Sequence, residues 1–211
     1  MQKLHKTKTK MKLHNKNIWF TSDTHYGHKN IVLGETEWRD SSGNKPINSV
    51  RNFERSDDMN QTIINNINSL VGEDDYLFHL GDWSFGGVEN IKKFRDSIKC
   101  KNIVLLLGNH DHHIRNNNEN VKDLFLGVAD YIELKVTNDH HTGSQKFVLC
   151  HYPIISWNKQ YYGAKMLHGH QHKKGLDIIT QDDRMDVGVD GTDGLKPYHL
   201  NEVVQKLKDY K

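Results

Sequence analysis

The sequence predicts an α/β fold, mainly from the order of its apolar segments. Short apolar runs at residues 18–22, 76–80 and 103–107 are typical of strands that are buried on both faces. Between them, in residues 57–70 and 88–98, apolar side chains recur at the spacing of an amphipathic helix. A β-α-β-α-β order predicts parallel strands joined by right-handed crossovers. Sheets of this kind place their functional groups at the carboxyl ends of the strands.

The stretch from Leu105 to Asp111 indicates what these strand ends carry. The apolar run stops at Gly108, which lets the backbone turn sharply, and Asn109, His110 and Asp111 follow at once. Burying such polar side chains without partners costs roughly 2–7 kcal/mol each. We therefore expect them to face a cleft in which other groups satisfy them.

Four other strand-like runs end in residues of the same kind, and many of the 15 histidines of the chain lie in these endings. Five such endings in one chain are hard to assign to chance. The four further endings are Asp23-Thr24-His25, Gly81-Asp82, His151 and Gly169-His170-Gln171-His172.

Length and composition fit one soluble globular domain. The chain has 211 residues, of which 35% are hydrophobic and 27% charged. No apolar run approaches the roughly 20 residues that cross a bilayer, and no apolar segment follows the basic N-terminus as it would in a signal peptide. The two cysteines, Cys100 and Cys150, fit reduced thiols better than a disulfide framework. We expect a cytoplasmic protein with no membrane partner.

Charge is distributed unevenly along the chain. Residues 1–16 contain six lysines and no acidic residue, so we expect residues 1–17 to form a basic, disordered tail. A weak contact with phosphate or nucleic acid is the alternative interpretation of this tail. The rest of the chain holds 23 basic and 27 acidic residues, so it is mildly acidic. We expect residues 18–211 to form a single domain.

The remaining elements of the first half follow from local signals. Residues 28–33 predict a short helix, and the polar residues 34–56 predict a long loop of the functional or lid type. Ser56 is the expected N-cap of the helix at 57–70. Residues 112–120 are polar and rich in asparagine, and they predict an exposed loop.

The second half is more β-like. Residues 138–144 predict a hairpin turn, and Asn201 is the expected cap of a last helix. Five runs predict further strands, at residues 131–136, 146–150, 164–168, 176–180 and 184–189.

Seven side chains at the strand ends are candidate metal ligands: Asp23, His25, Asp82, Asn109, His151, His170 and His172. Oxygen and imidazole ligands without thiolate suit divalent ions, with manganese favoured and iron, zinc, nickel or magnesium as alternatives. One site needs three or four ligands, so seven fit two adjacent ions. Asp82 is the expected bridging carboxylate. Two ions about 3.5–4 Å apart can clamp the oxygens of a phosphoryl transfer and hold a hydroxide nucleophile.

The reaction also needs an acid for the leaving group, and His110 is the candidate because it directly follows a ligand on the same turn. His28 could reach the substrate phosphate or, equally, cap a helix. Trp157 could stack a nucleobase, although packing at the rim is the commoner role of such a residue. Arg39 could bind phosphate from the long loop, although loop arginines are usually solvated.

The ordered set of motifs resembles the calcineurin-like metallophosphoesterases from residue 18 to about 190. Each motif alone is weak, but their order is specific. The resemblance implies a four-layer α/β/β/α sandwich of two mixed sheets flanked by helices. It also implies two metal sites that share Asp82, with His110 as acid or transition-state stabiliser. The implied ligands are Asp23, His25, Asp82 and His172 at one ion and Asp82, Asn109, His151 and His170 at the other.

The chain departs from the protein phosphatases of this superfamily, in which an Asp-Arg pair orients the histidine and binds phosphate. This chain has Phe85 and Gly86 at the positions of that Asp-Arg pair. Its third motif, Gly108-Asn109-His110-Asp111, ends in Asp111 where the protein phosphatases have Glu. A phosphoprotein phosphatase is therefore disfavoured. The chain is more similar to the short bacterial and phage phosphoesterases, and this leaves open what orients His110.

We expect a metal-dependent phosphoesterase, with a phosphodiesterase on a small nucleotide-type substrate favoured. A phosphomonoesterase acting on a nucleotide or phosphosugar is the alternative. A nuclease is less favoured because the acidic body suits a phosphate backbone poorly. A scaffold that has lost catalysis is disfavoured because no candidate ligand is missing. The sequence does not indicate an oligomeric state.

Overall fold

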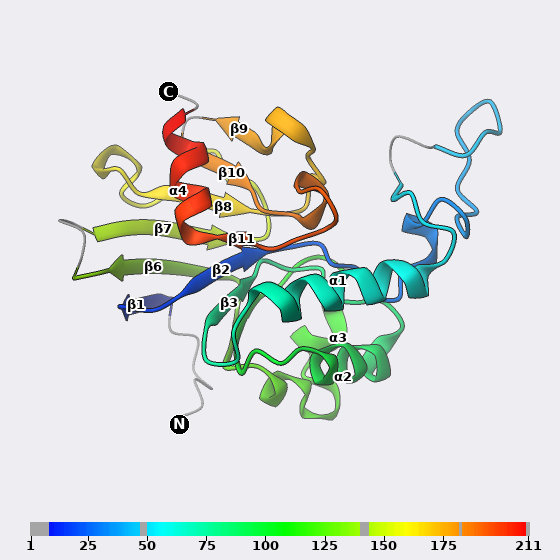
Figure 1. Cartoon of the computed structure of the whole chain (residues 1–211), viewed down its shortest axis with the longest axis horizontal. Coiled ribbons are helices and arrows are strands. Elements are labelled where there is room, and N and C mark those ends of the chain that lie inside the picture. The colour runs from blue at the N-terminus through cyan, green and yellow to red at the C-terminus, as the bar shows by residue number, and fades with distance from the viewer. Residues whose placement is uncertain (1–8, 47–49, 140–143, 182, 210–211) are drawn as a thin grey trace.

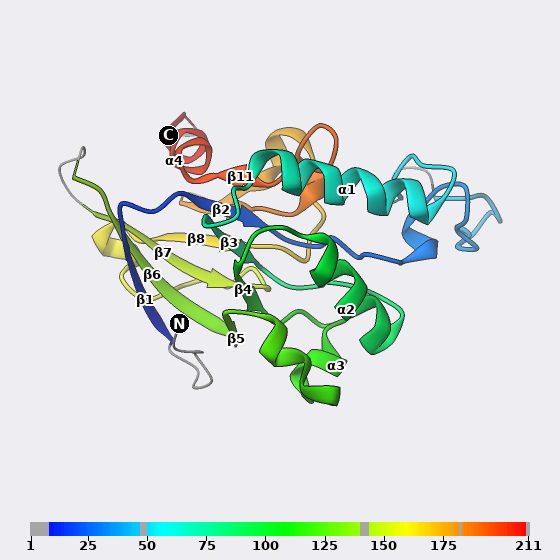
Figure 2. The same cartoon turned by 60° about the horizontal axis from the view of Figure 1, so that its bottom comes forward.

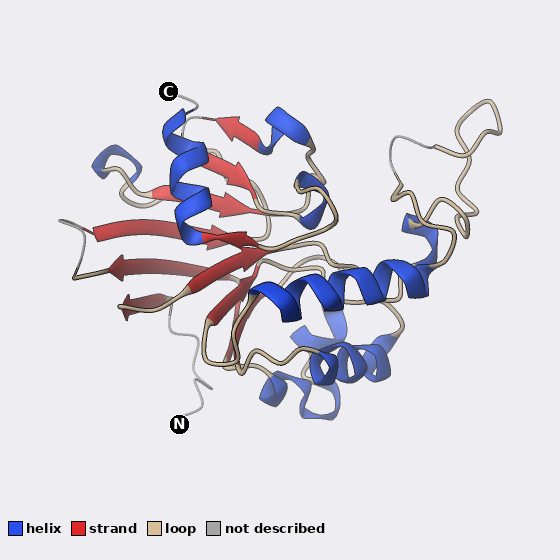
Figure 3. Ribbon diagram, in the orientation of Figure 1, coloured by secondary structure: helices blue, strands red, loops and turns tan. Residues whose placement is uncertain are grey.

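The computed structural model describes residues 9–46, 50–139, 144–181 and 183–209, which form two mixed sheets flanked by helices (Figures 1 and 3). In the five-stranded sheet, β2, β3, β4 and β5 are parallel, and β11 pairs antiparallel with β2. Its order is β11 (Tyr198–His199), β2 (Ile18–Thr21), β3 (Tyr76–His79), β4 (Asn102–Leu106) and β5 (Gly127–Ala129).

The six-stranded sheet combines parallel and antiparallel pairs. The arrowheads of β2, β7 and β8 point to the same side of the molecule in Figure 1, so these strands of the two sheets deliver their carboxyl ends to one edge. The strand order is β1 (Lys10–His14), β6 (Tyr131–Thr137), β7 (Ser144–Cys150), β8 (Lys165–His168), β10 (Arg184–Asp186) and β9 (Ile179–Gln181).

Three α-helices cover the outer face of the five-stranded sheet, and α4 lies against β2, β10 and β11 (Figure 2). None of the helices in the described ranges is both long and apolar enough to cross a membrane. The α-helices are α1 (Ser56–Leu70), α2 (Gly87–Ser97), α3 (His112–Arg115) and α4 (Leu200–Asp209). Short 3₁₀ helices are η1 (Lys29–Ile31), η3 (Asn118–Leu124), η4 (Gln160–Tyr162), η5 (Gly175–Ile178) and η6 (Val189–Gly191).

Successive side chains of a strand point to opposite faces of the sheet, so the apolar side chains form separate cores on the two faces. Phe20, Phe78 and Phe147 meet between the two sheets, where the ring of Phe20 lies 5.8 Å from that of Phe78 and 5.7 Å from that of Phe147. Ile63 and Ile67 of α1 belong to the second core, on the helical side of the five-stranded sheet. Fully burying one such side chain stabilises the fold by about 1.5–3 kcal/mol. This packing fixes β2, β3 and β4 in register and holds their ends together.

A third, small core lies on the outer face of the six-stranded sheet. Residues 151–164 connect the parallel strands β7 and β8, so the chain must cross that face. Trp157 packs there against Val148 and Met166, and its Nε1 donates a hydrogen bond to the Ala164 carbonyl at 2.7 Å.

The predicted α/β class and the β-α-β-α-β order are confirmed. The structure differs from the predicted tail, because Lys10–His14 form β1 and pair with β6, while residues 1–8 lie outside the described ranges. Alternation explains β1: Leu13 enters the core while its lysines face outward.

Four smaller expectations need correction. Asn201, the expected cap of the last helix, is the second residue of α4, which begins at Leu200. Ser56 is the first residue of α1 rather than its N-cap, and the Glu35 carboxylate accepts its N–H at 2.5 Å. The loop expected at 112–120 contains α3 and the start of η3. The first part of the run at 176–180 is η5, and β9 follows it. The core of the predicted hairpin turn, 140–143, lies outside the described residues.

Candidate metal centre

The candidate ligands lie on strained turns at the carboxyl ends of the strands. The φ angles of Asp23, His25 and Asp82 are 56°, 47° and 57°, and those of His170 and His172 are 73° and 51°. A left-handed conformation costs a non-glycine residue about 1–2 kcal/mol. Five of the seven candidates share it, so the surrounding structure holds these side chains in one place at the expense of stability.

The buried Asp111 carboxylate ties the two central turns together. It accepts the N–H groups of Gly108 and Asp82 at 2.8 Å and that of Trp83 at 2.9 Å. Gly108 has to be glycine, because a Cβ there would collide with Asp82. Asp111 therefore sets the distance between the ends of β3 and β4.

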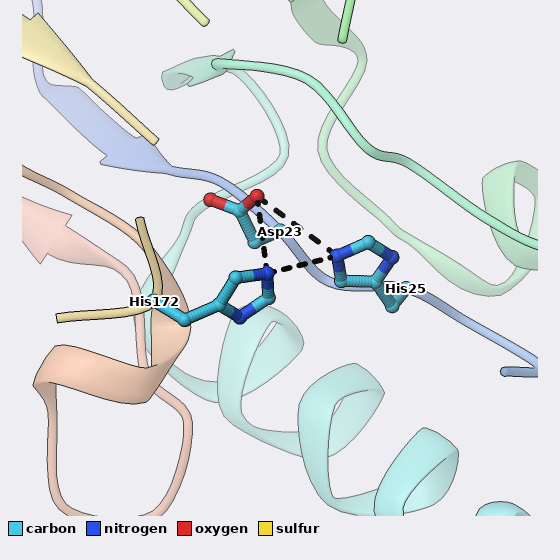
Figure 4. Close-up of side chains that lie close together, drawn as sticks. All are labelled: Asp23, His25 and His172. Atoms are coloured by element: carbon cyan, nitrogen blue, oxygen red, sulfur yellow. Dashed lines mark hydrogen bonds and ion pairs between the residues drawn. The ribbon is translucent and has the colours of Figure 1, made fainter. Parts of the chain in front are cut away.

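Asp23, His25 and His172 form the first group of candidate ligands (Figure 4). His25 Nε2 and His172 Nε2 are 3.3 Å apart, and they lie 3.9 and 3.8 Å from Asp23 Oδ1. His172 Nδ1 donates to Asp190 Oδ2 at 2.8 Å, so in the neutral ring its Nε2 presents a lone pair to this space.

Asp82, Asn109, His151 and His170 converge in the second group. His151 Nδ1 donates to the Leu80 carbonyl at 2.8 Å, which leaves its Nε2 as an acceptor. That Nε2 lies 3.1 Å from Asn109 Oδ1 and 3.6 Å from Asp82 Oδ2. His170 Nδ1 lies 3.1 Å from the same Asn109 oxygen.

Two carboxylates lie between these groups. Asp82 Oδ2 is 3.6 Å from both His25 Nε2 and His151 Nε2. Asp23 is close to ligands of both groups, but both of its oxygens accept the His170 N–H, at 3.0 and 3.1 Å. The position of Asp82 Oδ2, equally far from a histidine of each group, favours Asp82 as the shared ligand.

The donor set fits divalent cations because acceptors face acceptors. His151 Nε2 points at carboxylate and amide oxygens, and a cation would satisfy all of these lone pairs at once. Burial, opposed by His172 and reinforced by Asp82, raises the pKa of Asp23 to about 7. Burial also holds the pKa of His25 well below its usual value, so its ring is neutral, as a metal ligand must be.

Arg51 and Asp190 support His172 from behind. Arg51 is buried and donates to both Asp190 oxygens. Burial alone would raise the pKa of Asp190, but the charge and hydrogen bonds of Arg51 outweigh it and hold that pKa far below its usual range. Burial lowers the pKa of His172, yet the hydrogen bond to Asp190 and the charge of Asp23 leave it raised.

His110 stands at the open side of the cluster. Its backbone N–H donates to Asp82 Oδ1 at 2.9 Å, and its ring lies 4.7 Å from that of Phe85. Phe85 stacks on His28 at 3.7 Å, and Trp38, 42% exposed, meets His28 edge-on at 5.7 Å. Trp38, His28, Phe85 and His110 form a continuous aromatic row beside the candidate ligands.

The three candidate substrate contacts are placed differently. His28 lies in the aromatic row, near the cluster. Arg39 is exposed, and its Nη1 donates to the carbonyls of Thr36 and Trp38. Trp157 is only 6% exposed and packs in the third core, so its indole does not face the cluster.

Sequence reasoning missed the roles of Arg51 and Asp111. Arg51 lies in the polar segment 34–56, where nothing distinguishes a buried arginine from a solvated one. Asp111 follows a candidate ligand, but its bonds reach the turn of another strand. Asp190 carries a weak signal, because it lies near the end of a strand-like run that contributes to the site.

Known proteins are similar to this chain in sequence and in fold. A family model described as calcineurin-like phosphoesterase matches residues 16–180. The gene 66 protein of Mycobacterium phage D29 is 28% identical over 92% of this chain and 96% of its own length. Protein MJ1445 of Methanocaldococcus jannaschii is 29% identical over 76% of this chain and 72% of its own. The crystal structure of AQ665, a protein of unknown function from Aquifex aeolicus, shares the fold, with a TM-score of 0.62 and 21% identity over 90% of this chain and 99% of that one.

Proposed function

The chain belongs to the calcineurin-like phosphoesterase family, and from this membership we propose that it is a metal-dependent phosphodiesterase acting on a small nucleotide-type substrate. One observation carries the proposal: ligands from several strand ends converge around Asp82 Oδ2, which is 3.6 Å from a histidine of each group. A phosphoester bound there would meet the open side of the cluster, where His110 lies.

We assign two divalent ions to the cluster, with manganese favoured. Asp23, His25, Asp82 and His172 would hold one ion, and Asp82, Asn109, His151 and His170 the other. When bound, such ions activate water and neutralise charge on the phosphoryl group. Leu80, through its carbonyl, and Asp190, through its carboxylate, keep the rings of His151 and His172 in the tautomer that can ligate.

His110 is the proposed general acid. Its backbone N–H donates to Asp82 Oδ1, so the residue that carries the ring is held beside the proposed shared carboxylate. A protonated imidazole can donate its proton to the leaving oxygen as the P–O bond breaks. Phe85 packs 4.7 Å from this ring and limits its freedom, in the place where the protein phosphatases use an aspartate.

Two features favour a diester over a monoester. A monoester carries about two negative charges near pH 7 and calls for additional cationic groups. Arg51 cannot supply one, because it donates to Asp190 and to the carbonyls of Asp23 and Thr24. The aromatic row offers an apolar surface to a second ester group, and a nucleobase is a suitable occupant.

The test compares hydrolysis of bis-p-nitrophenyl phosphate and p-nitrophenyl phosphate with added manganese and with EDTA. We expect faster turnover of the diester and its loss in EDTA. Faster turnover of the monoester would replace this proposal with a phosphomonoesterase. Absence of turnover on both, with metal bound, would favour a scaffold.

The role of His110 is tested by His110→Ala, with His112→Ala as the matched control because His112 is an exposed histidine two residues along. We expect kcat to fall by roughly 10²–10⁴ in the first variant and to stay unchanged in the second. Metal content should be normal in both. Normal turnover in His110→Ala would remove His110 from the mechanism.

We further propose a cytoplasmic location, because Cys100 and Cys150 are both free thiols.

A further inference from the structure

Three lysines stand side by side on the outer face of the six-stranded sheet. Lys12 of β1 pairs in register with Lys135 of β6, and Lys135 pairs with Lys146 of β7. Their neighbours Leu13, Leu134 and Phe147 face the core between the sheets, so the three lysines point the other way. We call Lys12, Lys135 and Lys146 the lysine row.

The lysine row is unfavourable for the fold itself. Neighbouring strands lie about 4.8 Å apart, and like charges directly opposite one another destabilise a sheet. None of the three lysines forms an ion pair with a carboxylate in the described part of the chain. Residues that lower the stability of the fold and gain no compensating contact indicate a functional role.

The lysine row lies in a groove. Five lysines of the described part of the chain line this groove: Lys10, Lys12, Lys135, Lys146 and Lys159. Among the described residues that line it, Glu133 is the one carboxylate residue, and it lies 3.9 Å from Lys10 and accepts from Asn158 at 2.8 Å. The groove therefore has a strong positive charge on a body whose sequence after residue 16 is acidic overall.

Exposed aromatic rings adjoin the groove. Lys159 precedes η4, which carries Tyr161 and Tyr162, and these residues are 98% and 80% exposed. Tyrosine rings left so fully in water contribute nothing to the core. Base–aromatic stacking contributes about 1–3 kcal/mol per base, and lysines beside stacking rings are the pattern of surfaces that bind single strands.

We propose that this face of the six-stranded sheet binds single-stranded nucleic acid. The lysine row would contact successive phosphates, and Tyr161 and Tyr162 would stack on unpaired bases, which a duplex does not offer. Charge complementarity with the groove selects a polyanion, and the two exposed rings select one with aromatic bases. This binding requires no hydrolysis at the metal centre, so it stands or fails independently of the proposed phosphodiesterase activity.

The experiment measures fluorescence anisotropy of a labelled oligothymidylate of about 20 nucleotides, titrated with the full-length protein in EDTA so that no cleavage occurs. The variant Lys135→Gln/Lys146→Gln should bind at least about tenfold more weakly, and its salt dependence should fall by about 1.4 in log–log slope. Tyr161→Ala/Tyr162→Ala should also bind at least about fivefold more weakly, with an unchanged slope.

The control is Lys92→Gln/Lys206→Gln, which removes the same charge from half-exposed helical sites away from the groove. It should bind the oligonucleotide like the wild type. Because like charges are removed, the melting temperature of the lysine-row variant should equal or exceed that of the wild type, and a lower one would contradict the cost assigned to the row.

Three results would overturn the proposal. The first is absence of saturable binding by the wild type at about 50 mM salt. The second is an equal loss of affinity in the control and in the lysine-row variant. The third is equal affinity for heparin and for the single strand, together with no loss in the tyrosine variant, which would mark the groove as a general polyanion surface.

Discussion

Arg51 and Asp190 form a bidentate ion pair, with Nε 2.9 Å from Oδ1 and Nη2 2.8 Å from Oδ2. Arg51 also donates to the carbonyls of Asp23 and Thr24 at 2.6 and 3.0 Å. Asp190 in turn accepts from His172 Nδ1. One buried guanidinium thus fixes both the turn after β2 and the histidine that faces it.

The first prediction concerns this pair. Arg51→Lys cannot reproduce the fork of hydrogen bonds, so His172 and the Asp23 turn should lose their fixed positions. We expect manganese affinity to fall about 10–100-fold, as it does when partners of metal-ligating histidines are lost. Isothermal titration calorimetry of the metal-free protein measures this directly.

Arg39→Lys is the matched control for Arg51→Lys, because Arg39 lies in the same segment but is exposed. It should bind manganese like the wild type. Equal affinities in both variants would show that Arg51 does not position the ligands.

The second prediction concerns Gly81, whose φ is 101° and whose added Cβ would lie 2.5 Å from His151 Nδ1. Gly81→Ala should destabilise the protein by about 3 kcal/mol and displace His151 from the cluster. Gly43 has a φ of 83°, but nothing lies within 4 Å of its Cβ position. Gly43→Ala should therefore cost only about 1 kcal/mol, for the backbone alone. If denaturant unfolding gives the same loss of stability for Gly81→Ala and Gly43→Ala, steric crowding against His151 is not the cause.

The third prediction is a pH dependence. Burial lowers the pKa of His79 from 6.5 to about 3. The Thr24 hydroxyl donates to the Trp83 carbonyl, so it accepts a hydrogen bond from His79 Nε2. The lowered pKa keeps this ring neutral near pH 7. The unfolded chain binds a proton below pH 6.5 while the folded one does not, so stability falls as the pH falls from 6.5 toward 3.

The loss attributable to His79 should be on the order of 4 kcal/mol near pH 3. Denaturant unfolding of the metal-free protein at several pH values measures it. His79→Gln, which cannot titrate, should flatten this acid limb. If the free energy of unfolding of that variant still falls as steeply between pH 6.5 and pH 3, the pH dependence arises from other groups.

The fourth prediction distinguishes the structural role of Trp157 from a substrate-binding role of Phe85. Trp157→Phe loses the hydrogen bond to the Ala164 carbonyl and should destabilise the fold by about 1 kcal/mol while leaving KM for the diester unchanged. Phe85→Ala removes a ring from the aromatic row and should raise KM instead. A raised KM in Trp157→Phe would return this residue to the list of substrate contacts.

Much of the fold could be predicted because β2, β3 and β4 are continuous apolar runs whose ends carry unmistakable polar residues. The strand β1 could not, because its five residues contain two apolar side chains among lysines and its pairing partner, β6, lies more than a hundred residues away. A local pattern carries no information about such a partner.

The candidate ligands could be identified from their places after strands, but their support could not. Arg51 is buried because its segment returns beside η1, where its N–H and carbonyl pair with Ile31 and Leu33. Asp111 acts on the backbone of another turn rather than on a side chain. Both roles depend on three-dimensional proximity that residue type and spacing do not encode.

The most direct test of the shared carboxylate counts manganese ions bound per chain in the wild type, Asp82→Ala and Asp23→Ala. We predict two ions in the wild type, loss of both in Asp82→Ala and retention of one in Asp23→Ala. Loss of both ions in Asp23→Ala with one retained in Asp82→Ala would make Asp23 the bridge. A single ion in the wild type would contradict the two-ion centre itself.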